Sequence, residues 1–194
     1  KHYRIDIRVD PYKKTIIGMV DIAFQLLENT DQLTFDLLNR YSVSGVSVNN
    51  THLSFKKENN QIIVTNLGLP TFKDHLLTIK YGGKPPVAKN PPWDGGVTWS
   101  KDSEGFPWVS VSCQTNGAHI WFPCKEHPSD KADGAEIIIT APEQLIAVGN
   151  GLLISKEKQK DRWVKWHWQT KFPISTYNIN FAIGNFELVE TTSY

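Results

Sequence analysis

Apolar and polar residues alternate along most of this chain of 194 residues. In the first ten residues, one face of an extended chain would carry Tyr3, Ile5, Ile7 and Val9, and the other face would carry mainly charged side chains. A period of two residues is typical of a β-strand with one buried face. The alternation resumes at residues 20–26 after the turn sequence Asp-Pro-Tyr-Lys-Lys, so the first 26 residues predict a hairpin.

The same alternation continues in segments separated by short polar turns. Before residue 82 it covers residues 33–37, 46–48, 53–55, 62–64 and 77–81. After residue 134 we expect further strands in residues 135–142, 145–156, 162–170 and 175–190. In the last segment we expect Tyr177, Ile179, Phe181 and Ile183 to share one face. Residues 156–162 are charged and lack an apolar stripe, so they predict a hairpin loop rather than a helix. Together these patterns predict an all-β sandwich or meander of antiparallel strands.

Residues 82–107 interrupt this pattern. They are rich in Gly and Pro and contain Trp93, Trp99 and Phe106. Because Pro lacks a backbone N–H and Gly is costly to order, we expect a long surface excursion rather than a strand. The aromatic residues indicate that this excursion is held over its own sheet, and a functional loop is the alternative.

Charge and length exclude several classes of protein. The 21 basic and 20 acidic residues give a net charge of +1. So small a charge gives no electrostatic attraction to nucleic acid or to an anionic membrane surface. No apolar run approaches the roughly 20 residues of a membrane-spanning helix. We therefore expect a single, monomeric β domain over residues 1–194. Because the chain begins at Lys1 and not at Met, we expect it to be a segment of a longer protein.

Residues 113–134 are rich in side chains that could bind a metal or take part in catalysis. They contain both cysteines and two of the six histidines. Four of these residues could nominally bind a metal: Cys113, His119, Cys124 and His127. Their spacing lacks the C-x2-C pair of structural zinc sites, and the chain has neither H-E-x-x-H nor G-x-S-x-G. The residues alone thus predict no metal site and no catalytic residue.

The same stretch resembles the signature of the amino-terminal domain of M1-family zinc aminopeptidases, the family of aminopeptidase N and leukotriene hydrolase. The matching residues are Gln114, Phe122-Pro123-Cys124, Glu126, Pro128 and Lys131-Ala132. The opening hairpin, residues 136–153 and the closing motif also resemble this family. The closing motif consists of Pro173, Ser175, Tyr177, Phe181 and Gly184.

The resemblance implies an all-β fold, an antiparallel multi-sheet saddle or sandwich. It implies a non-catalytic domain that packs on its own downstream catalytic domain and lines the cleft for peptide substrates. Zn²⁺ and the catalytic residues belong to that missing domain, so we expect residues 1–194 to be inactive alone and to hold no cofactor. The complete metallopeptidase would release amino-terminal residues from peptides.

The resemblance assigns individual roles as well. Gln114 corresponds to the second Gln of the family's Gln-x-Gln motif, which reaches the cleft beside the substrate's amino end. This chain has Ser112-Cys113-Gln114 there, so only the second Gln of the motif is retained. His119 stands where the family has Arg, so we expect an ion pair there to be lost or to depend on pH. Pro123 and Cys124 are expected to be structural, and Glu126 and Lys131 to tie the loop by polar contacts.

Two alternatives stay open. Seven tryptophans are also consistent with an independent β-sandwich module that binds carbohydrate or protein. Cys113 and Cys124 could form a disulfide, but the sharp turn between them leads us to expect free thiols. The sequon Asn49-Asn50-Thr51 favours an exported, periplasmic or extracellular location.

Overall fold

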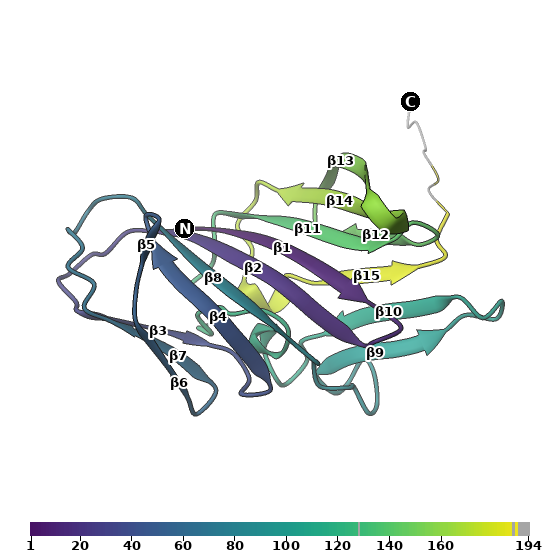
Figure 1. The fold of residues 1–194 in the computed structure, drawn as a ribbon, viewed down its shortest axis with the longest axis horizontal. Coiled ribbons are helices and arrows are strands. Elements are labelled where there is room, and N and C mark those ends of the chain that lie inside the picture. Colours follow the sequence, from purple (N-terminus) through teal and green to yellow (C-terminus); the bar gives the residue numbers. More distant parts are fainter. Residues whose placement is uncertain (128, 188, 190–194) are drawn as a thin grey trace.

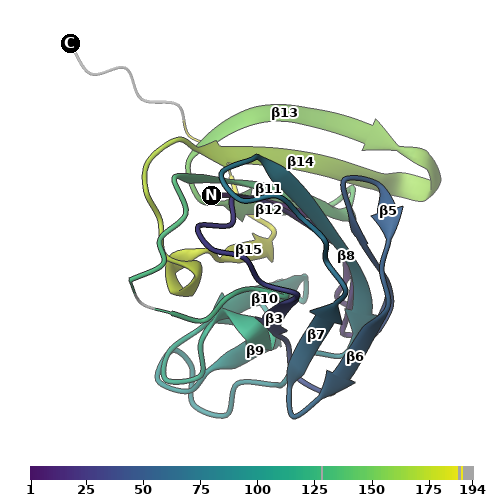
Figure 2. The same cartoon turned by 90° about the vertical axis from the view of Figure 1, so that its left-hand side faces the viewer.

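Three β-sheets enclose one hydrophobic core in the computed structural model, which describes residues 1–127, 129–187 and 189 (Figure 1). The largest sheet has the strand order β13-β14-β11-β1-β2-β8-β4-β5 and arches over the two smaller ones (Figure 2). Its strands are β1 (His2–Asp10), β2 (Thr15–Phe24), β4 (Tyr41–Val48), β5 (Thr51–His52), β8 (His75–Gly83), β11 (Gly134–Pro142), β13 (Leu152–Gln159) and β14 (Trp163–Thr170). Among the described residues, no helix has the length and apolar character needed to cross a membrane.

The second sheet has the order β12-β15-β10-β9 and the third has the order β3-β7-β6. Their strands are β3 (Gln32–Asp36), β6 (Phe55–Glu58), β7 (Gln61–Thr65), β9 (Gly96–Lys101), β10 (Pro107–Ser112), β12 (Ile146–Gly149) and β15 (Phe181–Gly184). Helical structure in the described residues consists of three single 3₁₀ turns, η1 (Ala118–Ile120), η2 (Lys160–Arg162) and η3 (Thr176–Asn178). The predicted all-β fold is confirmed.

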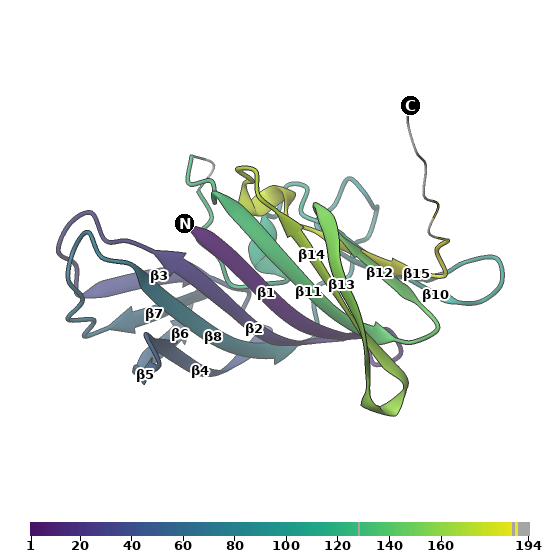
Figure 3. The ribbon, with the colours of Figure 1, turned by 90° about the horizontal axis from the view of Figure 1, so that it is seen from above.

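The predicted opening hairpin is confirmed, because β1 and β2 pair in antiparallel register. On β1 the residues Tyr3, Ile5, Ile7 and Val9 are buried, as the alternation requires. The other edge of β1 pairs with β11 in parallel, from His2 opposite Gly134 to Arg8 opposite Thr140. The large sheet is therefore mixed rather than wholly antiparallel, and Figure 3 shows β1 lying between β2 and β11. A parallel neighbour requires a long crossover, and local alternation carries no information about such a partner.

The prediction of an irregular excursion over residues 82–107 is wrong in its second half. Residues 96–101 form β9, which pairs with β10 from Lys101 opposite Pro107 to Gly96 opposite Ser112. Pro107 is tolerated because it is the first residue of its strand. Gly96 has φ 151°, and a Cβ there would lie 2.5 Å from the Ala88 backbone nitrogen. Gly is therefore required by close backbone packing at this position, and it does not mark the end of the sheet.

Two other boundaries also differ from the prediction. Residues 156–159 continue β13, so the hairpin turn is confined to η2, where Asp161 and Arg162 have positive φ. Charged side chains suit this strand because β13 is an exposed sheet edge. Residues 176–178 form η3, so Tyr177 turns outward and does not share a buried face with Phe181. Residues 188 and 190 of the predicted last strand lie outside the described residues.

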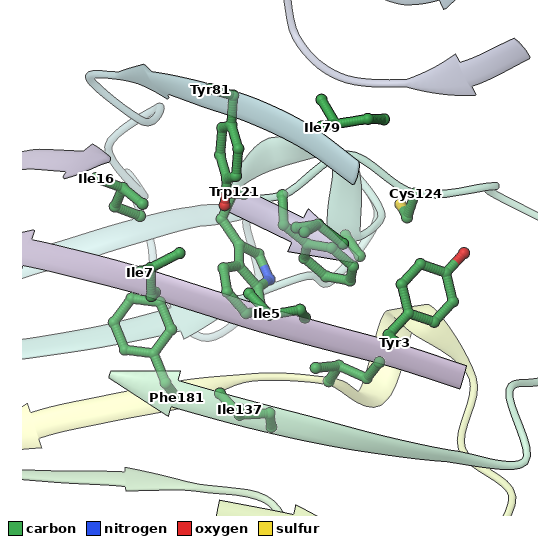
Figure 4. Packing of buried hydrophobic residues seen from close by; sticks show 14 of the residues in the cluster. Tyr3, Ile5, Ile7, Ile16, Ile79, Tyr81, Trp121, Cys124, Ile137 and Phe181 are labelled. Carbon is green, nitrogen blue, oxygen red and sulfur yellow. The ribbon is translucent and has the colours of Figure 1, made fainter. Parts of the chain in front are cut away.

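An irregular segment, residues 118–124, runs through the centre of the core. The indole of Trp121 is fully buried and packs edge-on against Phe122 and Phe181, with ring centroids 4.5 Å and 5.2 Å away (Figure 4). Because this segment belongs to no sheet, most of its backbone N–H and C=O groups lack the regular partners of a strand, and leaving them unpaired in the core would be costly.

Tyrosine hydroxyls and one neighbouring strand satisfy that backbone. Tyr41 donates to the Ile120 carbonyl at 2.7 Å, and Tyr81 donates to the Trp121 carbonyl at 2.9 Å. Cys124 exchanges two backbone hydrogen bonds with Asp36 of β3, at 2.7 Å and 3.1 Å. Burial raises the pKa of both tyrosines, so their hydroxyls remain protonated donors. The three sheets are thus joined through a chain segment that belongs to none of them.

We predict that Tyr81→Phe lowers the free energy of unfolding by about 1–3 kcal/mol, because the Trp121 carbonyl stays buried without its donor. Tyr12→Phe is the control, since Tyr12 is 67% exposed, and it should cost less than about 0.5 kcal/mol. Urea unfolding followed by tryptophan fluorescence measures both variants. Equal stability of Tyr81→Phe and Tyr12→Phe would contradict this account of the core.

Candidate functional site

Gln114 lies at the apex of a tight turn that leaves the end of β10. The Cys113 carbonyl accepts hydrogen bonds from the backbone N–H groups of Asn116, at 3.2 Å, and Gly117, at 2.9 Å. Thr115 has φ 62°, which closes the turn. Cys113 is buried and Gln114 is exposed, so the turn presents the Gln114 side chain to solvent from a fixed base.

The Pro-rich part of residues 85–95 lies against this turn. The Gly95 N–H donates to the Asn116 side-chain oxygen at 3.1 Å, and the Ser112 hydroxyl donates to the Pro92 carbonyl at 2.7 Å. A Cβ at Gly95 would lie only 2.4 Å from the Asn116 side chain, so glycine permits this contact. Trp93, in the same loop, is 73% exposed. The turn and the loop therefore form one continuous surface with an exposed indole.

Tyr177 reaches the same turn from η3. Its hydroxyl donates a hydrogen bond to Oε1 of Gln114, although the two residues are 63 positions apart in the sequence. Tyr177 is 43% exposed, whereas Thr176 and Ile179 beside it are buried. The fold therefore brings together one residue from each of two motifs singled out in the sequence.

The carboxylate of Glu126 holds the far side of the turn. It accepts a hydrogen bond from the backbone N–H of His119 at 2.8 Å, and the His119 ring nitrogen Nδ1 lies 3.4 Å away. The Cys124 thiol is 3.3 Å from the same oxygen. A Cβ at Gly117 would lie 2.7 Å from this carboxylate, so the close approach requires glycine. Glu126 ties the loop by polar contacts as expected, and the His119 ring lies within ion-pair distance of it.

The pKa of Glu126 reflects two opposing effects. Burial by itself would raise the pKa, but the hydrogen bonds from His119 and Cys124 outweigh burial and lower it. A carboxylate that accepts several hydrogen bonds is stabilised in its charged form. Glu126 is therefore ionised at neutral pH and acts as an anchor of the loop.

Within the described residues, Lys131 does not make the polar contacts that were expected to tie the loop. It is exposed, and its side chain has no polar contact within the described residues. Asp130 makes a polar contact in this loop instead, because its carboxylate lies 2.8 Å from the ammonium of Lys125. Neighbouring residues in a turn point in different directions, so the sequence alone did not show which one faces the loop.

The nominal metal-ligand set does not come together as one group. His119 and Cys124 face Glu126, whereas His127 bonds the Ser129 hydroxyl at 2.7 Å. Within residues 1–127, 129–187 and 189, no three His, Cys, Asp or Glu side chains are arranged to hold a metal ion. Cys113 and Cys124 are buried free thiols in this structure.

The fold and the turn together define an amino-terminal domain of the M1 peptidase class. Residues 1–178 match the Peptidase M1 N-terminal domain family, and the chain belongs to it. Human glutamyl aminopeptidase is 25% identical over 99% of this chain, and rat aminopeptidase O is 22% identical over 68%. The chain spans 21% and 16% of the lengths of these relatives.

Solved structures show the same fold. An M1 zinc metallopeptidase from Deinococcus radiodurans superposes with a TM-score of 0.78 at 21% identity, covering 95% of this chain and 41% of that chain. Native yeast LTA4 hydrolase superposes with a TM-score of 0.72 at 22% identity, covering 95% of this chain and 28% of that chain. The predicted family and fold class are confirmed, and membership of this family favours the peptidase domain over an independent binding module.

Sequence reasoning singled out Gln114 as a candidate but missed the residues that contact its turn and its side chain. Asn116 and Gly95 are typical turn residues, and the sequence gives no other reason to select them. Tyr177 was expected on a strand, on the same face as Phe181. The Ser-Thr-Tyr-Asn run could have predicted the turn at Tyr177, because it interrupts the apolar alternation with residues typical of turns.

We predict that Glu126→Gln lowers the free energy of unfolding by about 1–3 kcal/mol at pH 7, because its hydrogen bonds to the charged carboxylate weaken. A carboxyl group with a lowered folded pKa stabilises the protein above its ordinary pKa of 4.5, and this contribution is lost as the pH falls through the folded value. The difference between wild type and variant should therefore shrink below about pH 4.5. Glu143→Gln, at an exposed pair with Arg162, is the control for urea titrations at several pH values. A difference that stays constant from pH 7 to pH 3 would refute this assignment.

We predict two reduced thiols that react slowly in the native state. Burial raises the pKa of Cys113 to about 12, and burial together with the charge of Glu126 raises the pKa of Cys124. A thiol reacts as its thiolate, so little of the reactive form is present near neutral pH. Thiol titration without reductant should give two thiols in denaturant and slow labelling without it. Finding no thiols in denaturant would instead establish a disulfide.

Proposed function

We propose that residues 1–194 are the non-catalytic amino-terminal domain of a larger zinc aminopeptidase. In this proposal the domain packs on its downstream catalytic domain and lines the cleft that holds the peptide substrate. Membership of the M1 peptidase family and similarity to glutamyl aminopeptidase and aminopeptidase O support it. The complete protein would release the amino-terminal residue of a peptide.

Zinc would be held by the catalytic domain, where it would polarise the scissile carbonyl and activate water. The described residues of this chain offer no converging set of metal ligands. The contribution of residues 1–194 is therefore to bind and orient the substrate. The exposed surface around Gln114 and Trp93 is the part of the domain that we assign to the cleft.

The exposed carboxamide of Gln114, presented on a rigid turn, is the observation that carries this proposal. An amide oxygen has two lone pairs, and Tyr177 occupies one of them. The other can accept a hydrogen bond from the ammonium group at the amino end of a peptide. A neutral amide does this without placing another charge in a cleft from which water is excluded.

The interaction also matches the specificity of an exopeptidase. Along the main chain of a peptide a free ammonium exists only at the amino terminus, so an acceptor fixed at one point in the cleft selects the chain end. An internal peptide bond would leave the same acceptor without a charged partner. Gln114 would therefore contribute to substrate position, and the bond-breaking step would belong to the other domain.

We predict that Gln114→Ala in the full-length protein lowers kcat/KM for an aminoacyl arylamide by about ten- to hundredfold, the range for a lost hydrogen bond to a charged group. Because Gln114 is exposed in this domain, the melting temperature should change little. Gln144→Ala is the matched control, since Gln144 is exposed and bonds the Tyr12 hydroxyl away from the turn.

Activity and stability must be measured on the same preparations. If the melting temperature of Gln114→Ala falls sharply while activity per folded molecule stays normal, Gln114 has a structural role and the assignment to the cleft is withdrawn. Unchanged activity and unchanged melting temperature would also overturn it.

A further inference from the structure

The side chain of Gln114 has one polar contact within the described residues, and that contact is with the hydroxyl of Tyr177. The same hydrogen bond is the only polar contact of the Tyr177 side chain in that part of the chain. Both side chains are exposed, so neither is fixed by burial. Their mutual hydrogen bond is therefore what fixes the direction of the Gln114 carboxamide.

The backbone on both sides of this pair is already rigid. Gln114 follows the buried Cys113, whose carbonyl accepts two backbone hydrogen bonds across the turn. Tyr177 lies in η3, where the Ile179 N–H donates to the Thr176 carbonyl at 3.0 Å and both residues are buried. The two 3₁₀ turns η1 and η3 contact each other, which fixes the distance between the two motifs. The remaining conformational freedom is rotation about the side-chain bonds of Gln114 and Tyr177.

An exposed glutamine on a fixed backbone still samples several rotamers, and binding must then select one of them. Tyrosine has only two side-chain torsions, so it is ordered at a small entropic cost. A hydrogen bond from such a side chain restricts the glutamine before the substrate arrives, and this kind of preorganisation increases affinity.

We propose that Tyr177 is a positioning residue, which holds the Gln114 amide oxygen toward the cleft so that its second lone pair meets the substrate ammonium. This inference rests on the proposed function of Gln114 and adds a second residue to the same site. Tyr177 acts through Gln114 and does not itself touch the substrate. The required chemical feature is the hydroxyl donor, which phenylalanine lacks at the same ring size.

The first experiment uses residues 1–194 and the side-chain amide signals of glutamine in ¹H–¹⁵N NMR spectra. Gln114→Ala identifies the signals of Gln114. In Tyr177→Phe we expect these signals to move to the positions of an unrestrained glutamine. Tyr12→Phe is the matched control, because it removes a tyrosine hydroxyl that bonds a different glutamine, Gln144. Gln114 signals that do not move in Tyr177→Phe would overturn the inference.

The second experiment is a double-mutant cycle in the full-length protein with an aminoacyl arylamide. We expect Tyr177→Phe to lower kcat/KM by about three- to tenfold, the size of one hydrogen bond between neutral groups. The loss should appear in KM, because the ammonium carries the same charge in the bound substrate and in the transition state. Tyr177→Phe combined with Gln114→Ala should be no worse than Gln114→Ala alone, and Tyr12→Phe should match wild type.

The outcomes separate this inference from the proposed function. Normal kinetics of Gln114→Ala would overturn the proposed function. Impaired Gln114→Ala with a normal Tyr177→Phe would overturn the inference and leave the proposed function in place. Additive losses in the double variant would show that Tyr177 does not act through Gln114, which also overturns the inference. Melting temperatures of all variants establish that each comparison is made on folded protein.

Discussion

The architecture depends on the burial of residues 118–124, a segment that begins with the 3₁₀ turn η1 and belongs to none of the three sheets that meet around it. Its large apolar side chains stabilise the core, but its peptide groups must find hydrogen-bond partners there. Tyr41 and Tyr81 provide hydroxyl donors from the large sheet, and Asp36 provides backbone pairing from the third sheet. Two of the three sheets therefore provide hydrogen-bond partners for the backbone of this segment.

The candidate site follows from the same constraint. The turn that carries Gln114 directly precedes the buried segment. Glu126 lies just after that segment and accepts a hydrogen bond from the backbone N–H of His119 near its start. Both ends of the turn are thus fixed by the core, although its apex is exposed. A polar side chain on such a rigid base can be held in position for a ligand without contributing to the stability of the fold. Measuring both the activity and the stability of Gln114 variants therefore distinguishes a role in ligand binding from a role in the fold.

Local sequence patterns predicted much of the fold, because strands with one buried face must alternate. The hairpin of β1 and β2 and the strand β8 show this alternation, and burial follows it, whereas β11 is buried on both faces. The prediction was wrong where another physical effect decided the structure. Gly96 reads as a strand breaker, yet close backbone packing requires it inside β9. The closing motif reads as one strand, yet a 3₁₀ turn at residues 176–178 reverses the direction of Tyr177.

The sequence by itself determined the β class and the family, and it singled out Gln114 as a candidate, because alternation, turn residues and motif order are properties of neighbouring positions. Only the tertiary structure decided that β1 and β11 are parallel neighbours, that Asp130 and not Lys131 braces the loop, and that Tyr177 bonds Gln114. Each of these contacts joins a pair of elements or fixes the direction of one side chain in a turn. Such contacts depend on how the sheets stack around Trp121, and no local pattern of residues encodes that arrangement.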